Sequence, residues 1–418
     1  MLLIPLIYFI LTTIYFYRVH GHLNLDVAAS FVLAAISFFA ILIDVNDLYG
    51  KYGINEDSVN LFTVVLFCLQ WTLVLIPLNV LSSIPLKQHD SLKTPLLYGL
   101  TIVVIIASIV MIANSITDIR DALIMDMIDN YKTNAALRSI GGQEEKSSFM
   151  IFIASIFTSN PFPTLALFLW FYLTAFRSGN VVLRVGLLGA SIVQAVLSII
   201  VAGRAALIYW LLEFFLFYCY FSQYFSAKIR RTITIASMTI GSVIIALLFS
   251  ITMSRFGDDS GDKTNDPLMS LYGYAGQQVN NFSTMIMEGA DAPFQITRIL
   301  PFSGRVLTGQ HFDLIEHYEK IHAAVNIQAN VFSTFGGEVY LDLGAFGYIM
   351  MLLLLVLISL KLKVSWEELT FHRVFAFVII VTFFSRGLFA WPFVGQTCTF
   401  ALVFFVMFHI LFKYEYKV

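Results

Sequence analysis

Long apolar blocks separated by short polar segments dominate this chain, and the pattern predicts a membrane protein. Apolar runs of about 17–25 residues are long enough to cross the hydrocarbon core of a bilayer as helices. We find such runs at residues 2–17, 25–43, 59–80, 95–116, 160–177, 181–202, 204–226, 233–253, 337–360, 372–389 and 393–412. The sequence therefore predicts an all-α polytopic membrane protein, in which residues 1–418 form one integral membrane domain with about 11 transmembrane helices.

Two polar segments are longer than connecting turns. Residues 118–147 begin with apolar side chains at helical spacing among carboxylates, which predicts an amphipathic helix on the membrane surface. Residues 254–336 separate the eighth and ninth predicted spans and are too many for a simple connection. Within this large loop, Leu268–Met287 predicts a further helix. Prolines at 161 and 163 interrupt the fifth run, so residues 148–158 are alternatively an interfacial or re-entrant piece.

Basic side chains set the expected orientation, because Lys and Arg are enriched in cytoplasmic loops. Lys228, Arg230 and Arg231 lie in a short turn between two predicted spans and give the strongest cytoplasmic signal. Alternating from that turn places the C-terminus in the cytoplasm and the N-terminus outside. Both long polar segments then lie outside, and the loop of residues 254–336 is the expected place for chemistry.

The composition agrees with a membrane protein and argues against a soluble domain and against a nucleic-acid-binding protein. Hydrophobic residues make up 58% of the chain and charged residues 12%, whereas a soluble domain carries about 25% charged residues. The net charge of -2 offers no basic field for nucleic acid. Cys68, Cys219 and Cys398 lie inside apolar runs and are expected as buried hydrophobic residues. No CxxC or HExxH spacing occurs, so we expect neither a metal nor a cofactor.

Three sequence stretches carry a resemblance to a known family. They are Ala202-Gly203-Arg204, the Tyr272-Gly273-Tyr274 segment leading to Asn280-Asn281-Phe282, and Asn330-Val331-Phe332-Ser333-Thr334-Phe335 followed by Tyr340-Leu341-Asp342-Leu343-Gly344. Together they resemble the Wzy-type O-antigen and oligosaccharide repeat-unit polymerases, within the superfamily that includes the O-antigen ligases. The resemblance covers the C-terminal half. Phe332 and Ser333 stand where the family tends to have Tyr and Thr.

The resemblance implies a reaction and a location. It implies a metal-independent glycosyltransferase of the bacterial cytoplasmic (inner) membrane, with its active site facing the periplasm or the exterior. Its substrates would be undecaprenyl-diphosphate-linked oligosaccharides, which are joined into a surface polysaccharide such as O-antigen or capsule. A chain-length regulator is a further partner that the resemblance implies. Membrane lipids are expected around the spans, and nucleic acid is not a partner.

The implied leaving group, a lipid diphosphate, needs its negative charge stabilised, and arginine binds phosphate oxygens bidentately while staying charged. The candidates are Arg204 and Arg255 for catalysis, and Arg298, Arg305 and Arg386 for substrate binding. Arg204 is the first choice, because it lies between two spans with almost no loop and follows Gly203. For each arginine the alternative interpretation is a side chain that anchors a helix end at the membrane surface.

A base is also expected for the acceptor hydroxyl. His311 is preferred among the loop histidines His311, His317 and His322, although a solvent-exposed polar role is the alternative for each. Glu338 and Asp342 begin the ninth predicted span, where a carboxylate is costly unless paired, so each is a candidate base or arginine partner. Tyr272 and Tyr274 are candidates for stacking on sugar rings, and Asn330 for substrate binding. Aromatic residues in such a composition are otherwise core or interfacial.

Two other functions stay open at this point. An O-antigen ligase would move a finished glycan onto lipid A-core with the same diphosphate chemistry. A lipid-linked oligosaccharide flippase or other transporter would show intramembrane charges or helices broken near the midplane. Charges here cluster at the outer boundary and Glu213 is the clear exception, so we expect the polymerase.

Overall fold

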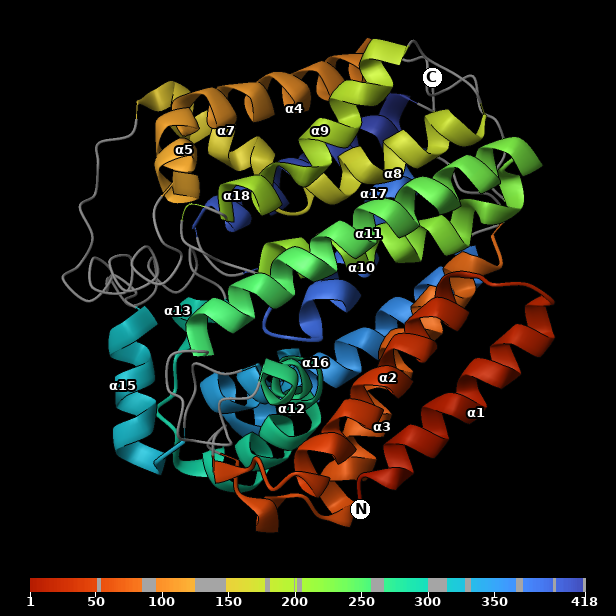
Figure 1. Cartoon of the computed structure of the whole chain (residues 1–418). Coiled ribbons are helices and arrows are strands. Elements are labelled where there is room, and N and C mark those ends of the chain that lie inside the picture. The colour runs from red at the N-terminus through yellow and green to blue at the C-terminus, as the bar shows by residue number, and fades with distance from the viewer. Residues whose placement is uncertain are drawn as a thin grey trace. The chain divides into compact units, whose positions relative to one another are not determined.

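The computed structural model is helical in every described element. It describes residues 1–50, 54–84, 95–124, 148–176, 181–198, 200, 205–256, 267–299, 314–327, 332–365, 371–393 and 396–415. These residues contain no strand, which confirms the all-α prediction (Figure 1). The chain divides into two compact units. Unit 1 comprises Met1–Pro85, Asp259–Glu368 and Ile380–Thr399, and unit 2 comprises Leu86–Asp258, Leu369–Ile379 and Phe400–Val418.

Seven of the described helices are long and apolar enough to cross a membrane. They are α1 (Leu3–His20), α2 (Leu25–Val45), α3 (Leu61–Ser82), α4 (Pro95–Asn114), α9 (Val181–Ser198), α10 (Ala205–Phe221) and α16 (Phe335–Ser365). An eighth span results if α7 (Phe149–Thr158) and α8 (Phe162–Ala175), which meet at a bend of 55°, count as one. The predicted spans at residues 233–253, 372–389 and 393–412 coincide with α11 (Ala227–Phe256), α17 (Phe371–Gly387) and α18 (Gln396–Glu415), which are not among the helices that meet the length and hydropathy requirement. The structure therefore supports a membrane protein with seven or eight helices that are able to span the bilayer.

Unit 1 begins with α1, α2 and α3 running side by side (Figure 1). Gly21, with a φ of 71°, ends α1, because glycine adopts this left-handed conformation without a side-chain penalty. Asn24 then caps α2 by accepting a hydrogen bond from the Leu25 N–H. Within α1 only Pro5 and Phe9 are buried, so most of its apolar surface faces outward, as suits contact with lipid.

Helix α12 (Pro267–Glu288) confirms the helix predicted inside the large loop, and it packs against α2, α3 and α16. Gly276 permits this packing, because a Cβ there would lie 2.3 Å from the backbone carbon of Phe39. The helix is unusually polar for a buried element. Its buried polar side chains are Gln277, Gln278, Asn280, Asn281, Ser283 and Thr284.

Short elements complete unit 1 around the end of α12. They are η2 (Glu56–Ser58), η7 (Gly289–Asp291), α13 (Ile296–Ile299) and α15 (Leu314–Val325). An apolar cluster of Met285, Ile321, Ile327 and Leu341 docks α15 against α12 and α16. This cluster fixes which face of α15 turns inward.

Unit 2 packs α4, α7, α8, α9 and α10 together with α5 (Ile116–Ile124) and η5 (Ser222–Tyr224). Aromatic rings fill its core. Phe171 stacks on Phe221 with ring centroids 5.6 Å apart, and Phe168 contacts Phe377 at 5.3 Å. Helix α5 covers the start of the predicted amphipathic segment, and residues 125–147 lie outside the described residues.

Candidate functional site

Helix α16 is broken at Gly344, and the break defines the candidate site. Gly344 has a φ of 68° and a ψ of -172°, so a short first segment, from Phe335 to Leu343, is separated from the long apolar remainder. No atom lies within 4 Å of a Cβ built at Gly344, so backbone conformation is what favours glycine there. The first segment carries both carboxylates that the sequence singled out.

Glu338 and Asp342 lie four residues apart on this first segment and therefore share one helical face. Both are buried, with exposed fractions of 3% and 0%. The Glu338 carboxylate accepts a hydrogen bond from the backbone N–H of Trp391, in the turn that follows α17. The Asp342 backbone carbonyl accepts one from the Gln295 N–H at 2.7 Å. Each of these two residues, Glu338 through its carboxylate and Asp342 through its backbone carbonyl, thus ties the start of α16 to a different segment of unit 1.

The side chain of Asp342 pairs with His317 on α15. The imidazole Nε2 lies 2.8 Å from Oδ1 of the carboxylate, and His317 is 3% exposed. A carboxylate that holds one ring nitrogen orients the imidazole and stabilises its charged form, which is the arrangement that prepares a histidine to act as a base. Of the three loop histidines, the structure therefore brings His317 onto a predicted site residue, whereas the sequence favoured His311.

A strained segment precedes α16 and is held by α3 and α12. Thr334, a β-branched residue, has a φ of 95°. Its hydroxyl accepts a hydrogen bond from Gln70 of α3 at 3.3 Å, and Asn281 of α12 donates to the Phe332 carbonyl at 2.9 Å. Gly336 allows this approach, because a Cβ there would lie 2.1 Å from Oε1 of Gln70. Such over-determined strain is typical of functional sites.

The turn after α17 brings another predicted residue to the same end of α16. Gly387 packs on Phe335, where a Cβ would lie 3.1 Å from the ring, and Arg386 immediately precedes it. The Arg386 carbonyl accepts hydrogen bonds from the Phe389 and Ala390 N–H groups, which shape the turn toward Trp391. Arg386, Glu338 and Asp342 are therefore the predicted site residues that the structure gathers around the start of α16.

The two tyrosines predicted for sugar stacking contact protein side chains. Tyr272 lies against Phe39 of α2, with ring centroids 6.3 Å apart, and against the apolar cluster that includes Ile43. Tyr274 meets Phe332 edge to face at 5.5 Å. Both are half-buried on α12, so part of each ring is used in packing.

For several predicted site residues the structure gives no side-chain geometry. Arg204, Arg305, His311 and Asn330 lie outside the described residues. Arg255 belongs to α11 and Arg298 to α13, and only their helical backbone is described. Their assignment rests on the sequence alone.

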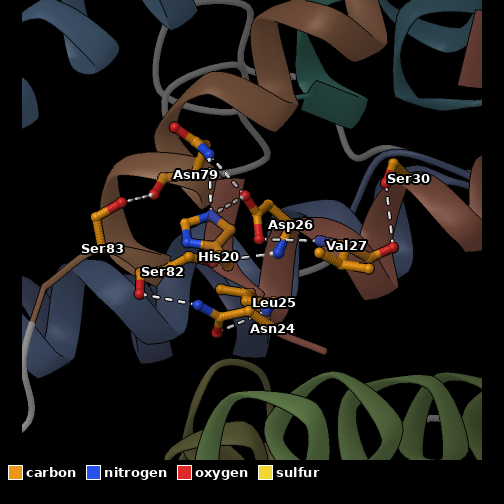
Figure 2. Close-up of polar contacts among 9 residues, drawn as sticks. All are labelled: His20, Asn24, Leu25, Asp26, Val27, Ser30, Asn79, Ser82 and Ser83. Atoms are coloured by element: carbon orange, nitrogen blue, oxygen red, sulfur yellow. Dashed lines mark hydrogen bonds and ion pairs between the residues drawn. The ribbon is translucent and has the colours of Figure 1, made fainter. Parts of the chain in front are cut away.

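A second buried polar cluster, which was not predicted from the sequence, joins the C-terminal ends of α1 and α3 to the start of α2 (Figure 2). Oδ2 of Asp26, which is fully buried, lies 2.8 Å from the His20 Nε2 and accepts from the Asn79 Nδ2 at 2.6 Å. Its Oδ1 accepts from the Val27 N–H at 2.9 Å. The Asp26 N–H in turn donates to the Ser82 hydroxyl at 3.2 Å. Both carboxylate oxygens have partners, so this cluster fastens three helix ends together.

A third polar contact lies beyond the C-terminal end of α2. Tyr49 donates a hydrogen bond to Asp44 at 2.8 Å. Burial raises the pKa of the Tyr49 phenol well above its ordinary value, and the Asp44 hydrogen bond and charge raise it further. The phenol therefore stays protonated and holds the connection that leads to η2.

Neither a metal-ligand cluster nor a similarity to known proteins assigns a function to these residues. Within the described part of the chain, no group of three or more His, Cys, Asp or Glu side chains is arranged to hold a metal ion. No protein-family model matches the chain, and no curated protein or solved structure shows significant similarity to it. The function is therefore to be inferred from the chain's own residues.

Proposed function

We propose that this protein is a membrane glycosyltransferase that polymerises undecaprenyl-diphosphate-linked repeat units into a surface polysaccharide. The observation that carries the proposal is the buried His317–Asp342 pair beside Glu338, at the start of a broken helix that also bears the family-like sequence block. The protein would lie in the bacterial cytoplasmic membrane with about 11 spans. The loop of residues 254–336 would face the exterior.

In this hypothesis His317 takes the proton from the acceptor hydroxyl, while Asp342 holds the ring and stabilises the imidazolium. The acceptor oxygen forms a bond to the anomeric carbon of the donor sugar. The bond from that carbon to the diphosphate oxygen breaks, and its electron pair leaves with the lipid diphosphate. Arginines stabilise that charge, and Arg204, Arg255, Arg298, Arg305 and Arg386 are the candidates from the sequence. No metal is required by this scheme.

Burial of the pair has a consequence for the proposal. Because His317 and Asp342 are almost fully enclosed, an acceptor hydroxyl reaches the imidazole only when α15 moves from its apolar docking site. We therefore propose that substrate binding displaces α15. Tyr272, Tyr274 and Asn330 would contact the sugars in that open state.

Complementation tests the function. A polymerase-null host would express wild type with its cognate repeat unit, and surface glycan would be separated on a gel. A ladder of chain lengths supports the polymerase. Its collapse to a single-repeat band in Arg204→Ala, at unchanged protein level, supports that arginine's role. An unchanged ladder in the variant makes Arg204 a helix anchor.

A transporter of lipid-linked oligosaccharide is the second candidate. The observation that favours it is the presence of two helix breaks, at Gly344 and between α7 and α8, since transporters build sites at such breaks. Repeat units that accumulate on the cytoplasmic side of the null host, with wild type restoring their export, would favour this candidate. The third candidate function is an O-antigen ligase. Transfer of preformed glycan to lipid A-core would distinguish it from a polymerase and from a transporter.

A further inference from the structure

Trp391, in the turn that follows α17, carries a hydrogen-bond donor that the fold does not use. The ring atom Nε1 is enclosed by protein, and it has no hydrogen-bond partner among the described residues. The side chain as a whole is half-buried, so part of the ring stays accessible. An indole N–H only donates, and it usually finds an acceptor when it is buried. A bound ligand with an oxygen acceptor would satisfy it.

The position of this ring is fixed from two sides. The Trp391 backbone N–H donates to the buried carboxylate of Glu338, in the first segment of α16. The ring packs edge to face with Phe383 and Phe393, with ring centroids 6.1 and 6.2 Å away. Phe383 in turn contacts Phe335, the first residue of α16, at 4.7 Å. The accessible part of the ring is therefore held by packed neighbours, as a binding surface requires.

Trp71 of α3 shows what distinguishes Trp391 from a core tryptophan. Its Nε1 also has no hydrogen-bond partner among the described residues, but the whole side chain is buried. Its ring is surrounded by those of Phe67, Phe335 and Phe384, with centroids 6.4, 5.3 and 5.6 Å away. A ligand does not reach a ring enclosed in this way. Trp71 is therefore the matched control for Trp391.

The first segment of α16 relates Trp391 to the proposed base. Glu338 and Asp342 share one face of this segment and are four residues apart, which is about 6 Å along the helix axis. The Glu338 carboxylate holds the Trp391 backbone, and the Asp342 carboxylate holds the His317 imidazole. The indole and the imidazole are thus anchored about one helical turn apart on the same segment.

We propose that Trp391 binds a sugar of the acceptor, the lipid-linked repeat unit whose hydroxyl His317 would deprotonate. The ring stacks on the apolar face of a pyranose, and the indole N–H donates to one of its oxygens. A neutral donor on an apolar ring suits a sugar, whereas a diphosphate calls for the charge of arginine. This inference rests on the proposed function and adds to it the residue that orients the acceptor.

Fluorine NMR of the full-length protein, in a detergent without sugar groups, tests the proposal. Labelling with fluorotryptophan gives a signal for each of the five tryptophans, and Trp391→Phe and Trp71→Phe identify two of them. Trp391→Tyr identifies the same signal if the phenylalanine variant does not fold. One probe is the oligosaccharide repeat unit released from its lipid by mild acid. The other is farnesyl diphosphate, which has a diphosphate and no sugar.

We expect the Trp391 signal to shift with the oligosaccharide and not with farnesyl diphosphate, while the Trp71 signal stays in place with both. The contribution of the N–H is measured by calorimetry. Trp391→Phe keeps an aromatic ring and removes the donor, so the oligosaccharide should bind about threefold to tenfold more weakly. Trp71→Phe removes an N–H inside the core and should leave this affinity unchanged.

Two results in the wild-type protein would overturn the proposal. A Trp391 signal that neither probe moves means that the N–H is directed at the neighbouring phenylalanine rings and that the residue is structural. A signal that moves with farnesyl diphosphate assigns Trp391 to the diphosphate. Failure of the polymerase hypothesis is a separate result, because it appears as a missing ladder in complementation, whereas the Trp391 signal reports sugar binding alone.

Discussion

His317 on α15 and Asp342 on α16 form a buried pair in which Nε2 and Oδ1 lie 2.8 Å apart, although the residues are 25 positions apart in the sequence. The pair connects a helix of the large polar loop to the first segment of a broken membrane helix. Removing one member of such a buried pair leaves the other without its partner, which is a costly state. The pair is therefore expected to stabilise the fold. It is also the contact that would prepare His317 to act as the general base.

Asp342→Ala tests the stabilising part of this relationship. We expect the free energy of unfolding to fall by about 3–5 kcal/mol, because His317 stays buried without its acceptor. Thermal unfolding in detergent, followed by tryptophan fluorescence, measures the change. Glu316→Ala on the same helix is the control, since its ion pair with Lys320 is exposed and is expected to contribute less than about 1 kcal/mol. Equal effects of the two substitutions would contradict the buried pairing.

Asp26→Ala tests the cluster at the ends of α1, α2 and α3. The substitution leaves the His20 and Asn79 donors without their shared acceptor, so we expect a loss of about 3–5 kcal/mol. Asp57 is exposed, and Asp57→Ala should change stability by less than about 0.5 kcal/mol. We expect proteolysis to cut near residues 21–24 faster in Asp26→Ala than in wild type. An unchanged rate of cleavage there would mean that the cluster does not hold α1 in place.

Gly344→Ala tests whether the break in α16 depends on backbone conformation. A Cβ meets no atom within 4 Å, so the expected penalty of about 1–3 kcal/mol comes from the backbone conformation alone, which at a φ of 68° and a ψ of -172° is one that residues other than glycine rarely adopt. Gly189→Ala in α9 is the matched control, because its Cβ also meets nothing, and its helical backbone should tolerate or prefer alanine. A lower melting temperature in Gly344→Ala only is the predicted result. Unchanged melting in both would show that α16 does not need this conformation.

Gly276→Ala tests the packing of α12 on α2. Here the obstacle is backbone, since a Cβ would lie 2.3 Å from the Phe39 carbonyl carbon and 2.5 Å from the Ala40 nitrogen. Backbone cannot rotate away as a side chain can, so we expect a loss of at least about 1–3 kcal/mol. Hydrogen exchange should show α12 opening more readily than in wild type. Exchange identical to that of Gly99→Ala, a helix position with open space, would argue against this contact.

The helices were largely predictable because membrane burial imposes long apolar runs. The ranges predicted for the first three spans agree with α1, α2 and α3 to within a few residues, and the prolines at 161 and 163 correctly marked the bend between α7 and α8. Hydropathy also found α12 inside the loop. It did not reveal that α12 buries six polar side chains, because that depends on which helices surround it.

The polar pairs were harder to predict, since each joins residues far apart in the chain. Asp342 was identified because it lies at the start of an apolar run, but its partner was not, as His317 looks like any polar loop histidine. Asp26 offered the same signal, a carboxylate at the start of an apolar run that begins at residue 25. A buried carboxylate must find donors, and His20 and Asn79 lie at the ends of the two neighbouring runs.

Complementation of a polymerase-null host with His317→Gln and with His322→Ala distinguishes a catalytic His317 from a structural one. Glutamine donates a hydrogen bond toward Asp342 but cannot take up a proton at neutral pH, and His322 is the exposed histidine on the same helix. We expect His317→Gln to leave only single-repeat glycan at a normal protein level, and His322→Ala to keep the full ladder. A full ladder from folded His317→Gln would mean that His317 is not the base and that the His317–Asp342 pair is a structural contact.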